Sequence, residues 1–181
     1  MTLGLPPIRR FVTGVGENGK SKIVEDKPMD GKTLPERPGF RMANIWATTS
    51  TPARIKAPEE TEKLHGVHPP KNGTVIRVMD IPPQPKQDEA SKAQHQVTRA
   101  QMFPDASRHK VDTSRHPGMH MTDTVDYAII ISGELWAIME DGECLMRAGD
   151  VLVQRGTVHA WANRSNEMCR ICFVLIDGAW D

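Results

Sequence analysis

Short apolar runs, separated by turns that contain glycine, dominate the second half of the chain. Along residues 125–176 these runs are VDYAIIISG, ELWAIM, ECLMR, VLVQRG, TVHAWAN and MCRICFVLI. Runs of this length and spacing predict the strands of a barrel or sandwich rather than a parallel α/β sheet. The pair Asp141-Gly142 suits a tight hairpin turn between two of these strands. The pattern therefore predicts an all-β protein built on one antiparallel barrel.

The first part of the chain predicts a β extension to that barrel. IRRFVTG and SKIVED flank the pair Asn18-Gly19, which is a hairpin signal, and FRMANIWATTS predicts a further strand. His65 and His68 lie in a polar, proline-punctuated segment and are expected on the surface. The expected organisation is residues 1–73 as an N-terminal extension whose strands pack on the barrel, and residues 74–181 as the barrel itself.

Between these parts lies a polar stretch without an obvious periodicity. Residues 84–96, QPKQDEASKAQHQ, are nearly free of apolar side chains and predict a mobile loop. Residues 97–103, VTRAQMF, predict a return to strand structure. No long amphipathic helical pattern is apparent, so we expect no substantial helix.

The composition of the chain argues against nucleic-acid and membrane partners. Lys plus Arg and Asp plus Glu both number 23, so the formal net charge is zero, and no basic stripe suggests nucleic acid. No apolar run approaches the 18 or so residues of a membrane-spanning helix. The start, MTLGLPPIRRFV, lacks the apolar core of a signal peptide. A cytoplasmic protein with no nucleic-acid or membrane partner is expected.

Two of the three cysteines form a C-x-x-C sequence, which can indicate metal or redox chemistry. Cys169 and Cys172, however, fall within the strand pattern MCRICFVLI. Residues three apart in a strand face opposite ways. We therefore expect both thiols to be reduced and chemically inert.

The stretch that begins at residue 120 carries the strongest functional signal. Alternate side chains of a strand share one face, and here that face carries only polar groups: His120, Thr122, Thr124 and Asp126. Polar groups inside a small barrel are costly unless they are satisfied, so they usually line a pocket, a water cluster or an ion site. His159 and Trp161 share a face of a later strand.

The same residues resemble the first motif of the cupin superfamily, G-x5-H-x-H-x3,4-E-x6-G. His120 occupies the position of the first histidine, and Thr122 stands in the position of the second. Asp126 takes the place of the glutamate, and Gly133 follows after six further residues. The resemblance implies a cupin-type jelly-roll barrel whose two motifs meet at the barrel mouth.

The second cupin motif, G-x5-P-x-G-x2-H-x3-N, is matched further along. Gly149 begins it, one residue nearer to the following turn than usual, and Gly156, His159 and Asn163 then have the family spacing. The resemblance covers roughly residues 74–178. The start of the chain and its Asn-Gly-Lys turn are also similar to a group of small bacterial single-domain cupins of unassigned function.

The resemblance implies a metal site, because cupins typically bring three histidines and a glutamate to one divalent ion. Here His120, Asp126 and His159 would form a facial set of two histidines and one carboxylate, which suits Fe(II), Mn, Ni or Zn. Thr122 is a poor replacement for a ligand, and His116 is a candidate for a third imidazole. In the alternative interpretation, Asp126 holds threonine or backbone donors and the histidines line a polar pocket without metal.

Two classes of function remain open at this level. The first is a small-molecule enzyme of the dioxygenase, isomerase or decarboxylase type, in which His159 and Asp126 act on the substrate. The second is a non-catalytic small-molecule binding or sensor module with a degenerate metal site. In either class Thr122 and Trp161 are expected in the pocket. Arg155 is either a ligand for a substrate carboxylate or a solvated turn residue.

A homodimer is also expected. The N-terminal extension is too poor in apolar residues to form a domain of its own, so it should lie across its own barrel, a neighbour's barrel, or both. Pairing of this kind covers exposed strand edges.

Overall fold

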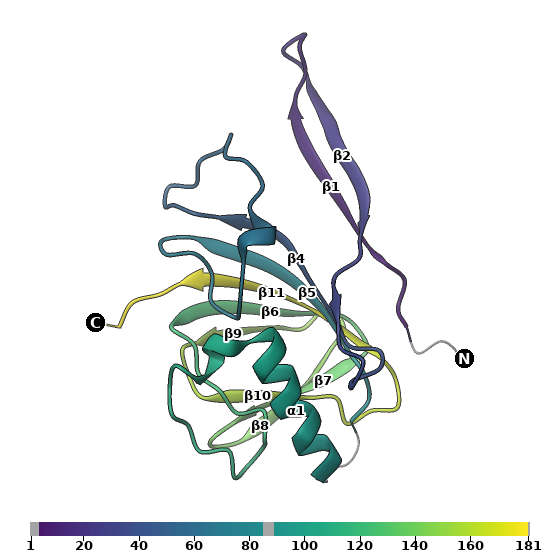
Figure 1. The fold of residues 1–181 in the computed structure, drawn as a ribbon, viewed down its shortest axis with the longest axis vertical. Coiled ribbons are helices and arrows are strands. Elements are labelled where there is room, and N and C mark those ends of the chain that lie inside the picture. Colours follow the sequence, from purple (N-terminus) through teal and green to yellow (C-terminus); the bar gives the residue numbers. More distant parts are fainter. Residues whose placement is uncertain (1–3, 85–88, 181) are drawn as a thin grey trace.

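The computed structural model describes residues 4–84 and 89–180, and within them the chain is mostly β-strand (Figure 1). The strands are β1 (Ile8–Val15), β2 (Ser21–Met29), β3 (Lys32–Thr33), β4 (Arg41–Thr48), β5 (Thr74–Ile81), β6 (Thr124–Ser132), β7 (Glu134–Met139), β8 (Glu143–Arg147), β9 (Val151–Arg155), β10 (His159–Ala162) and β11 (Cys169–Asp177). The helical elements are α1 (Glu89–Met102) and the short 3-10 turns η1 (Thr61–Lys63) and η2 (Pro104–Ser107).

Two antiparallel sheets form the barrel. The larger has the strand order β3-β4-β5-β11-β6-β9, and the smaller has the order β10-β7-β8. In the larger sheet the last strand, β11, lies between β5 and β6, which is the crossed connectivity of a jelly roll rather than of a simple meander. The predicted all-β barrel is confirmed.

The core lies between the inner faces of the two sheets. Along β6 the buried positions alternate with more exposed ones, as the strand period requires. Ala128 and Ile130 fill the apolar half of this inner row and pack with Leu135 and Ile171. Thr124 and Asp126 continue the same row at the other end of the strand, so one inward face passes from an apolar core to a polar cavity.

The N-terminal strands divide between two places. The predicted Asn18-Gly19 hairpin is confirmed: β1 and β2 pair in antiparallel register, and Gly19 has a φ of 75°, a conformation that suits glycine. This hairpin stands away from the barrel in Figure 1. β3 and β4, by contrast, extend the larger sheet beside β5.

The largest departure from expectation is α1, which spans most of the segment predicted as a loop followed by a strand. Residues 85–88 of that predicted loop lie outside the described residues. The buried face of α1 includes Ser91, Thr98 and Met102, which recur at helical spacing. Because two of these three residues are polar, the helical period does not appear as an apolar pattern, and the strand prediction for 97–103 was wrong.

The predicted hairpin turn and the predicted cysteine positions are both present in the structure. Asp141-Gly142 forms the predicted hairpin turn, in which the Met139 N–H donates to the Gly142 carbonyl at 3.1 Å. Cys169 and Cys172 are free, and they pack in different hydrophobic clusters on opposite faces of β11. The alternation argument for these cysteines is confirmed. Among the described helices, none is both long and apolar enough to cross a membrane.

Candidate functional site

His120 and His159 lie side by side because their backbones form an antiparallel bridge. Each N–H donates to the other residue's carbonyl, at 2.9 Å in both directions. Residues paired in this way project their side chains to the same side of the sheet. Their ring centroids are 4.3 Å apart.

Each of these rings has one nitrogen fixed by the backbone. Nδ1 of His120 contacts the Gly118 carbonyl at 2.9 Å, and Nδ1 of His159 contacts the Thr157 carbonyl at 2.9 Å. Because a carbonyl only accepts, Nδ1 carries the proton in both rings and Nε2 keeps its lone pair. Burial lowers the pKa of both imidazoles, that of His159 to about 3. Near neutral pH both are uncharged hydrogen-bond acceptors.

Asp126 is the carboxyl group of the site. It is only 4% exposed, and its Oδ1 is buried without a hydrogen-bond partner among the described residues. Burial raises the pKa of Asp126 to about 6, against the opposing charge of Arg77. A carboxyl group with this pKa exchanges its proton close to physiological pH.

These groups line one cavity of about 130 Å³ between the sheets and α1. All five residues predicted at the site, which are His120, Thr122, Asp126, His159 and Trp161, are on its wall. Thr122 accepts a 2.8 Å hydrogen bond from Thr124. Trp161 stands edge-on between His159 and Phe173, with centroid distances of 5.7 and 5.3 Å, so the polar groups face an aromatic wall.

The donor set does not fit the metal centre that the family resemblance implies. Within residues 4–84 and 89–180, no three His, Cys, Asp or Glu side chains are grouped closely enough to hold an ion. His120 and His159 offer two adjacent nitrogens, but Asp126 does not join them as a third ligand. His116 does not complete the set either: it is buried outside the cavity wall, where its Nδ1 accepts from the Gly118 N–H at 3.0 Å.

Sequence reasoning missed the cationic side of the cavity. Three arginines and one histidine line it in addition to the predicted residues: Arg37, Arg77, Arg99 and His95. Arg37 belongs to the β3–β4 connection, Arg77 to β5, and the other two to α1. The only available signal was the spacing of His95, Thr98 and Arg99 on one helical face, which the prediction of a loop concealed. Arg155, the arginine that the sequence singled out, is exposed and outside this cavity.

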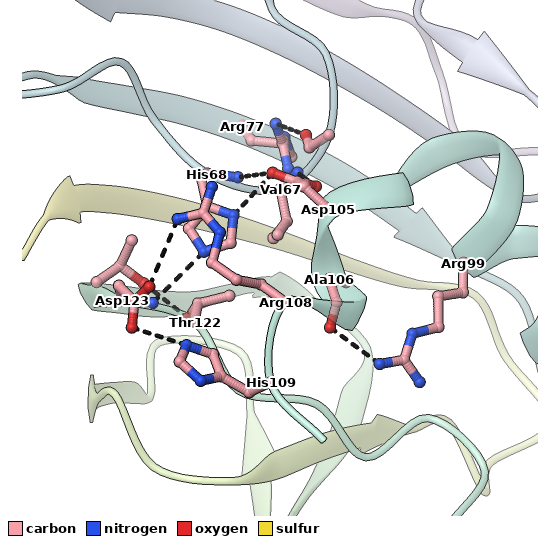
Figure 2. Close-up of polar contacts among 12 residues, drawn as sticks. Val67, His68, Arg77, Arg99, Asp105, Ala106, Arg108, His109, Thr122 and Asp123 are labelled. Carbon is pink, nitrogen blue, oxygen red and sulfur yellow. Dashed lines mark hydrogen bonds and ion pairs between the residues drawn. The ribbon is translucent and has the colours of Figure 1, made fainter. Parts of the chain in front are cut away.

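A polar network joins the loops that carry the cavity residues Val67 and Ala106 (Figure 2). Asp105 accepts hydrogen bonds from the backbone N–H groups of Val67 and His68 and from the His68 ring, at 2.7, 3.1 and 2.7 Å. Asp123 binds the ring of His109 at 2.8 Å. His68 was expected on the surface, but its side chain is largely buried. Asp105 provides the hydrogen-bond partner that this buried ring needs.

No protein-family model matches the chain. The Oryzines biosynthesis cluster protein J of Aspergillus oryzae is 30% identical over 182 residues, which cover 95% of this chain and 84% of that protein. The cupin-domain-containing oxidoreductase srdD of Neurospora crassa is 26% identical over 181 residues, covering 96% and 77%.

These two relatives come from fungi rather than from the bacterial group that the start of the chain resembles. Among solved structures, the Cupin 2 conserved barrel domain protein from Salinispora arenicola CNS-205 is similar over 85% of this chain and 89% of its own. It is 16% identical, with a TM-score of 0.45.

Proposed function

This chain belongs to the cupin-domain proteins, and we propose that it is an enzyme of natural-product biosynthesis that removes a proton from a small organic substrate. Two features support the proposal. Its relatives over nearly the full chain include a protein named as a cupin-domain oxidoreductase and one named for a biosynthesis cluster. Its cavity contains a carboxyl group, two neutral imidazoles and an aromatic wall.

The main support for the proposal is the buried position and raised pKa of Asp126. A carboxylate that is buried, lacks a hydrogen-bond partner at Oδ1 and has a pKa near 6 is a stronger base than an exposed aspartate. Its burial, together with apolar side chains such as Leu175 and Phe173 on the cavity wall, limits the access of water to the carboxylate. A base with little solvation takes a proton more readily.

The neighbouring groups would orient the substrate and balance charge. Nε2 of His120 and Nε2 of His159 can each accept a hydrogen bond, which suits a substrate that carries a hydroxyl group. The guanidinium of Arg77 lowers the pKa of Asp126 and so favours the ionised base. Its own position is fixed by hydrogen bonds to Asn44 Oδ1 at 2.8 Å and the Gly66 carbonyl at 2.9 Å.

Proton removal of this kind is the first half of an isomerisation, in which the C–H electrons shift into a double bond and the protonated Asp126 returns the proton to another atom of the same substrate. The proposal therefore covers the isomerase type expected from the sequence. A metal held by His120 and His159 would add Lewis-acid chemistry, but no step proposed here depends on it.

The alternative is a non-catalytic binding module, which the absence of a three-ligand group among the described residues favours. The two functions differ in what happens to a bound carbon acid: an enzyme removes its proton, whereas a binding module leaves it intact.

The test uses 5-nitrobenzisoxazole, a small aromatic probe that needs only a base. When a base takes the proton on C3, the electrons of the C–H bond form a nitrile, the N–O bond breaks, and a coloured phenolate is released. At pH 7.5 we expect the wild-type chain to be about 100-fold faster than Asp126→Asn, the effect of a positioned general base. Asp141→Asn, at the exposed hairpin turn, is the matched control. Equal rates for wild type and Asp126→Asn would refute the proposed base.

A further inference from the structure

We propose that Arg37, His95 and Arg99 form an anion-binding subsite in the same cavity, and that the natural substrate is a small organic acid held there by its carboxylate. This inference rests on the proposed function and adds a substrate class to it.

Arg37 is a buried cation without a counter-ion. It is 7% exposed, and its guanidinium lies 4.9 Å from the centre of the Phe40 ring. Its side chain makes no hydrogen bond or ion pair with any part of the chain that the structure describes. Burial lowers the pKa of Arg37 to about 10, and no carboxylate opposes that shift. Its guanidinium lines the cavity. A largely buried charge without a counter-ion is expensive, and an anion bound in the cavity would offset this cost.

His95 and Arg99 add unsatisfied nitrogens one helical turn apart on α1. Nε2 of His95 and Nε of Arg99 are both buried without a hydrogen-bond partner. The Arg99 guanidinium is positioned by a 2.9 Å hydrogen bond from its terminal nitrogen to the Ala106 carbonyl (Figure 2). Residues four apart on a helix share a face, and both line the cavity with Arg37.

Unpaired buried nitrogens are not a general property of this chain. Of the four buried side-chain polar atoms without a partner in the described residues, three belong to the cavity wall: His95 Nε2, Arg99 Nε and Asp126 Oδ1. Elsewhere, Arg10 is 4% exposed and bonds both carboxylate oxygens of Glu25. The chain thus satisfies a buried arginine outside the cavity and leaves polar groups unsatisfied within it.

Asp126 does not fill this role. Burial is the only cause of the shift in the Arg37 pKa, so no carboxylate of the described chain, Asp126 included, balances its charge. Burial also lowers the pKa of His95 to about 3, so this ring is neutral at pH 7.5 and the positive charges of the subsite are those of Arg37 and Arg99. A substrate carboxylate would balance these two charges.

The chemistry of the donors defines the ligand class. A guanidinium presents parallel N–H groups that match the two oxygens of a carboxylate. The adjoining wall contains Phe103, Trp161 and Phe173, which suit an aromatic or aliphatic body. The expected substrate is therefore a small, largely apolar carboxylic acid.

The test compares two probes of the same shape, benzoate and benzamide, by isothermal titration calorimetry at pH 7.5. We expect wild type to bind benzoate at least about 10-fold more tightly than benzamide, which corresponds to one charge-assisted contact of about 1.4 kcal/mol. Arg37→Met should remove this preference without weakening benzamide. Arg54→Met changes an exposed arginine in a loop outside the cavity and should leave the preference intact.

Stability provides a second readout. Because Arg37→Met removes an unpaired buried charge, its melting temperature should equal or exceed that of wild type, whereas a purely structural arginine would lower it. Arg99→Met is the second variant and should also reduce the benzoate preference. Equal binding of benzoate and benzamide by wild type, or an unchanged preference in both folded variants, would overturn the inference.

Separate measurements test the anion-binding subsite and the proposed base, so one hypothesis can be refuted while the other stands. Asp126→Asn should keep the preference for benzoate and lose elimination of the benzisoxazole. Benzoate selectivity without any base catalysis would support a carboxylate-binding module and refute the enzyme. Base catalysis without benzoate selectivity would support the enzyme and refute the carboxylate-binding subsite.

Discussion

His120 and His159, about forty residues apart in the chain, exchange two 2.9 Å backbone hydrogen bonds and so hold their imidazole rings with centroids 4.3 Å apart. Each ring is further fixed through Nδ1 by a backbone carbonyl. The pair is therefore an uncharged, oriented set of acceptors, and the titratable group beside it near neutral pH is Asp126.

The first prediction concerns the stability of Asp126→Asn. The pKa of Asp126 is raised from 3.8 to about 6 in the folded chain. The folded state thus favours the protonated carboxyl, and stability is lost as pH rises through about 6. A shift of this size corresponds to about 3 kcal/mol as an upper value.

Relative to wild type, Asp126→Asn should therefore gain up to about 3 kcal/mol in free energy of unfolding between pH 4 and pH 7.5. Urea denaturation at the two pH values measures this change. Asp141→Asn, at an exposed turn, should show no such trend. A constant difference between wild type and Asp126→Asn across this range would mean that the carboxyl titrates normally.

The second prediction concerns metal removal. Because no three His, Cys, Asp or Glu side chains stand close enough together among the described residues to hold an ion, dialysis against EDTA should leave the benzisoxazole rate within about twofold of its starting value. Loss of a positioned base, by contrast, costs roughly 100-fold. The rate before and after dialysis, with metal content measured in parallel, tests this. A large fall that added Fe(II), Mn(II), Ni(II) or Zn(II) restores would instead support the three-ligand site inferred from the family resemblance.

The third prediction concerns Asp80, which joins three strands of the larger sheet. It is 1% exposed, and its carboxylate accepts hydrogen bonds from Arg41 on β4 and Arg170 on β11, at 2.6–3.0 Å. Asp80→Ala leaves two arginines without their anion and should cost about 3–5 kcal/mol. Urea denaturation measures the loss. Asp30→Ala, an exposed control, should change stability by less than about 0.5 kcal/mol.

The fourth prediction is the homodimer. The β1–β2 hairpin exposes Phe11, Val15, Ile23 and Val24, each 52–70% accessible, and the β6–β9 face exposes Val151 and Val153. The base of the hairpin already packs on the outer side of its own sheet, where Ile8 joins Val78 and Cys172. A second copy that supplies the same hairpin would cover the rest of that outer face.

Light scattering should therefore give twice the 20.2 kDa mass of one chain. Val153→Lys should shift the equilibrium towards monomer, while Ile55→Lys, at a fully exposed loop position, should not. A monomeric wild-type chain at high micromolar concentration would refute this dimer.

Strand alternation and motif spacing predicted one part of the cavity wall but not Arg77 on β5. Alternation placed Asp126 on the inner face of β6, although this strand begins at Thr124 and His120 lies before it, in an isolated bridge with His159. The motif spacing brought His159 to the same cavity. Both arguments depend on local geometry with a fixed period, and neither requires knowledge of distant packing.

The cationic part of the cavity could not be predicted in this way. Arg37 reaches the cavity from a connection between strands, and α1 buries Ser91, His95 and Thr98 on its inner face to varying extents. A helix whose inner face is polar lacks the apolar period by which helices are recognised. Its partner is a cavity formed by residues distant in sequence, so its role becomes visible only in the folded chain.

The proposed function depends on Asp126 exchanging a proton near neutral pH inside this cavity. The most direct measurement is the ¹³C chemical shift of its side-chain carboxyl carbon as a function of pH, with Asp126→Asn used to assign the resonance. We expect a single titration with a midpoint near 6. A midpoint near 4, the ordinary value for an aspartate, would refute the proposed base.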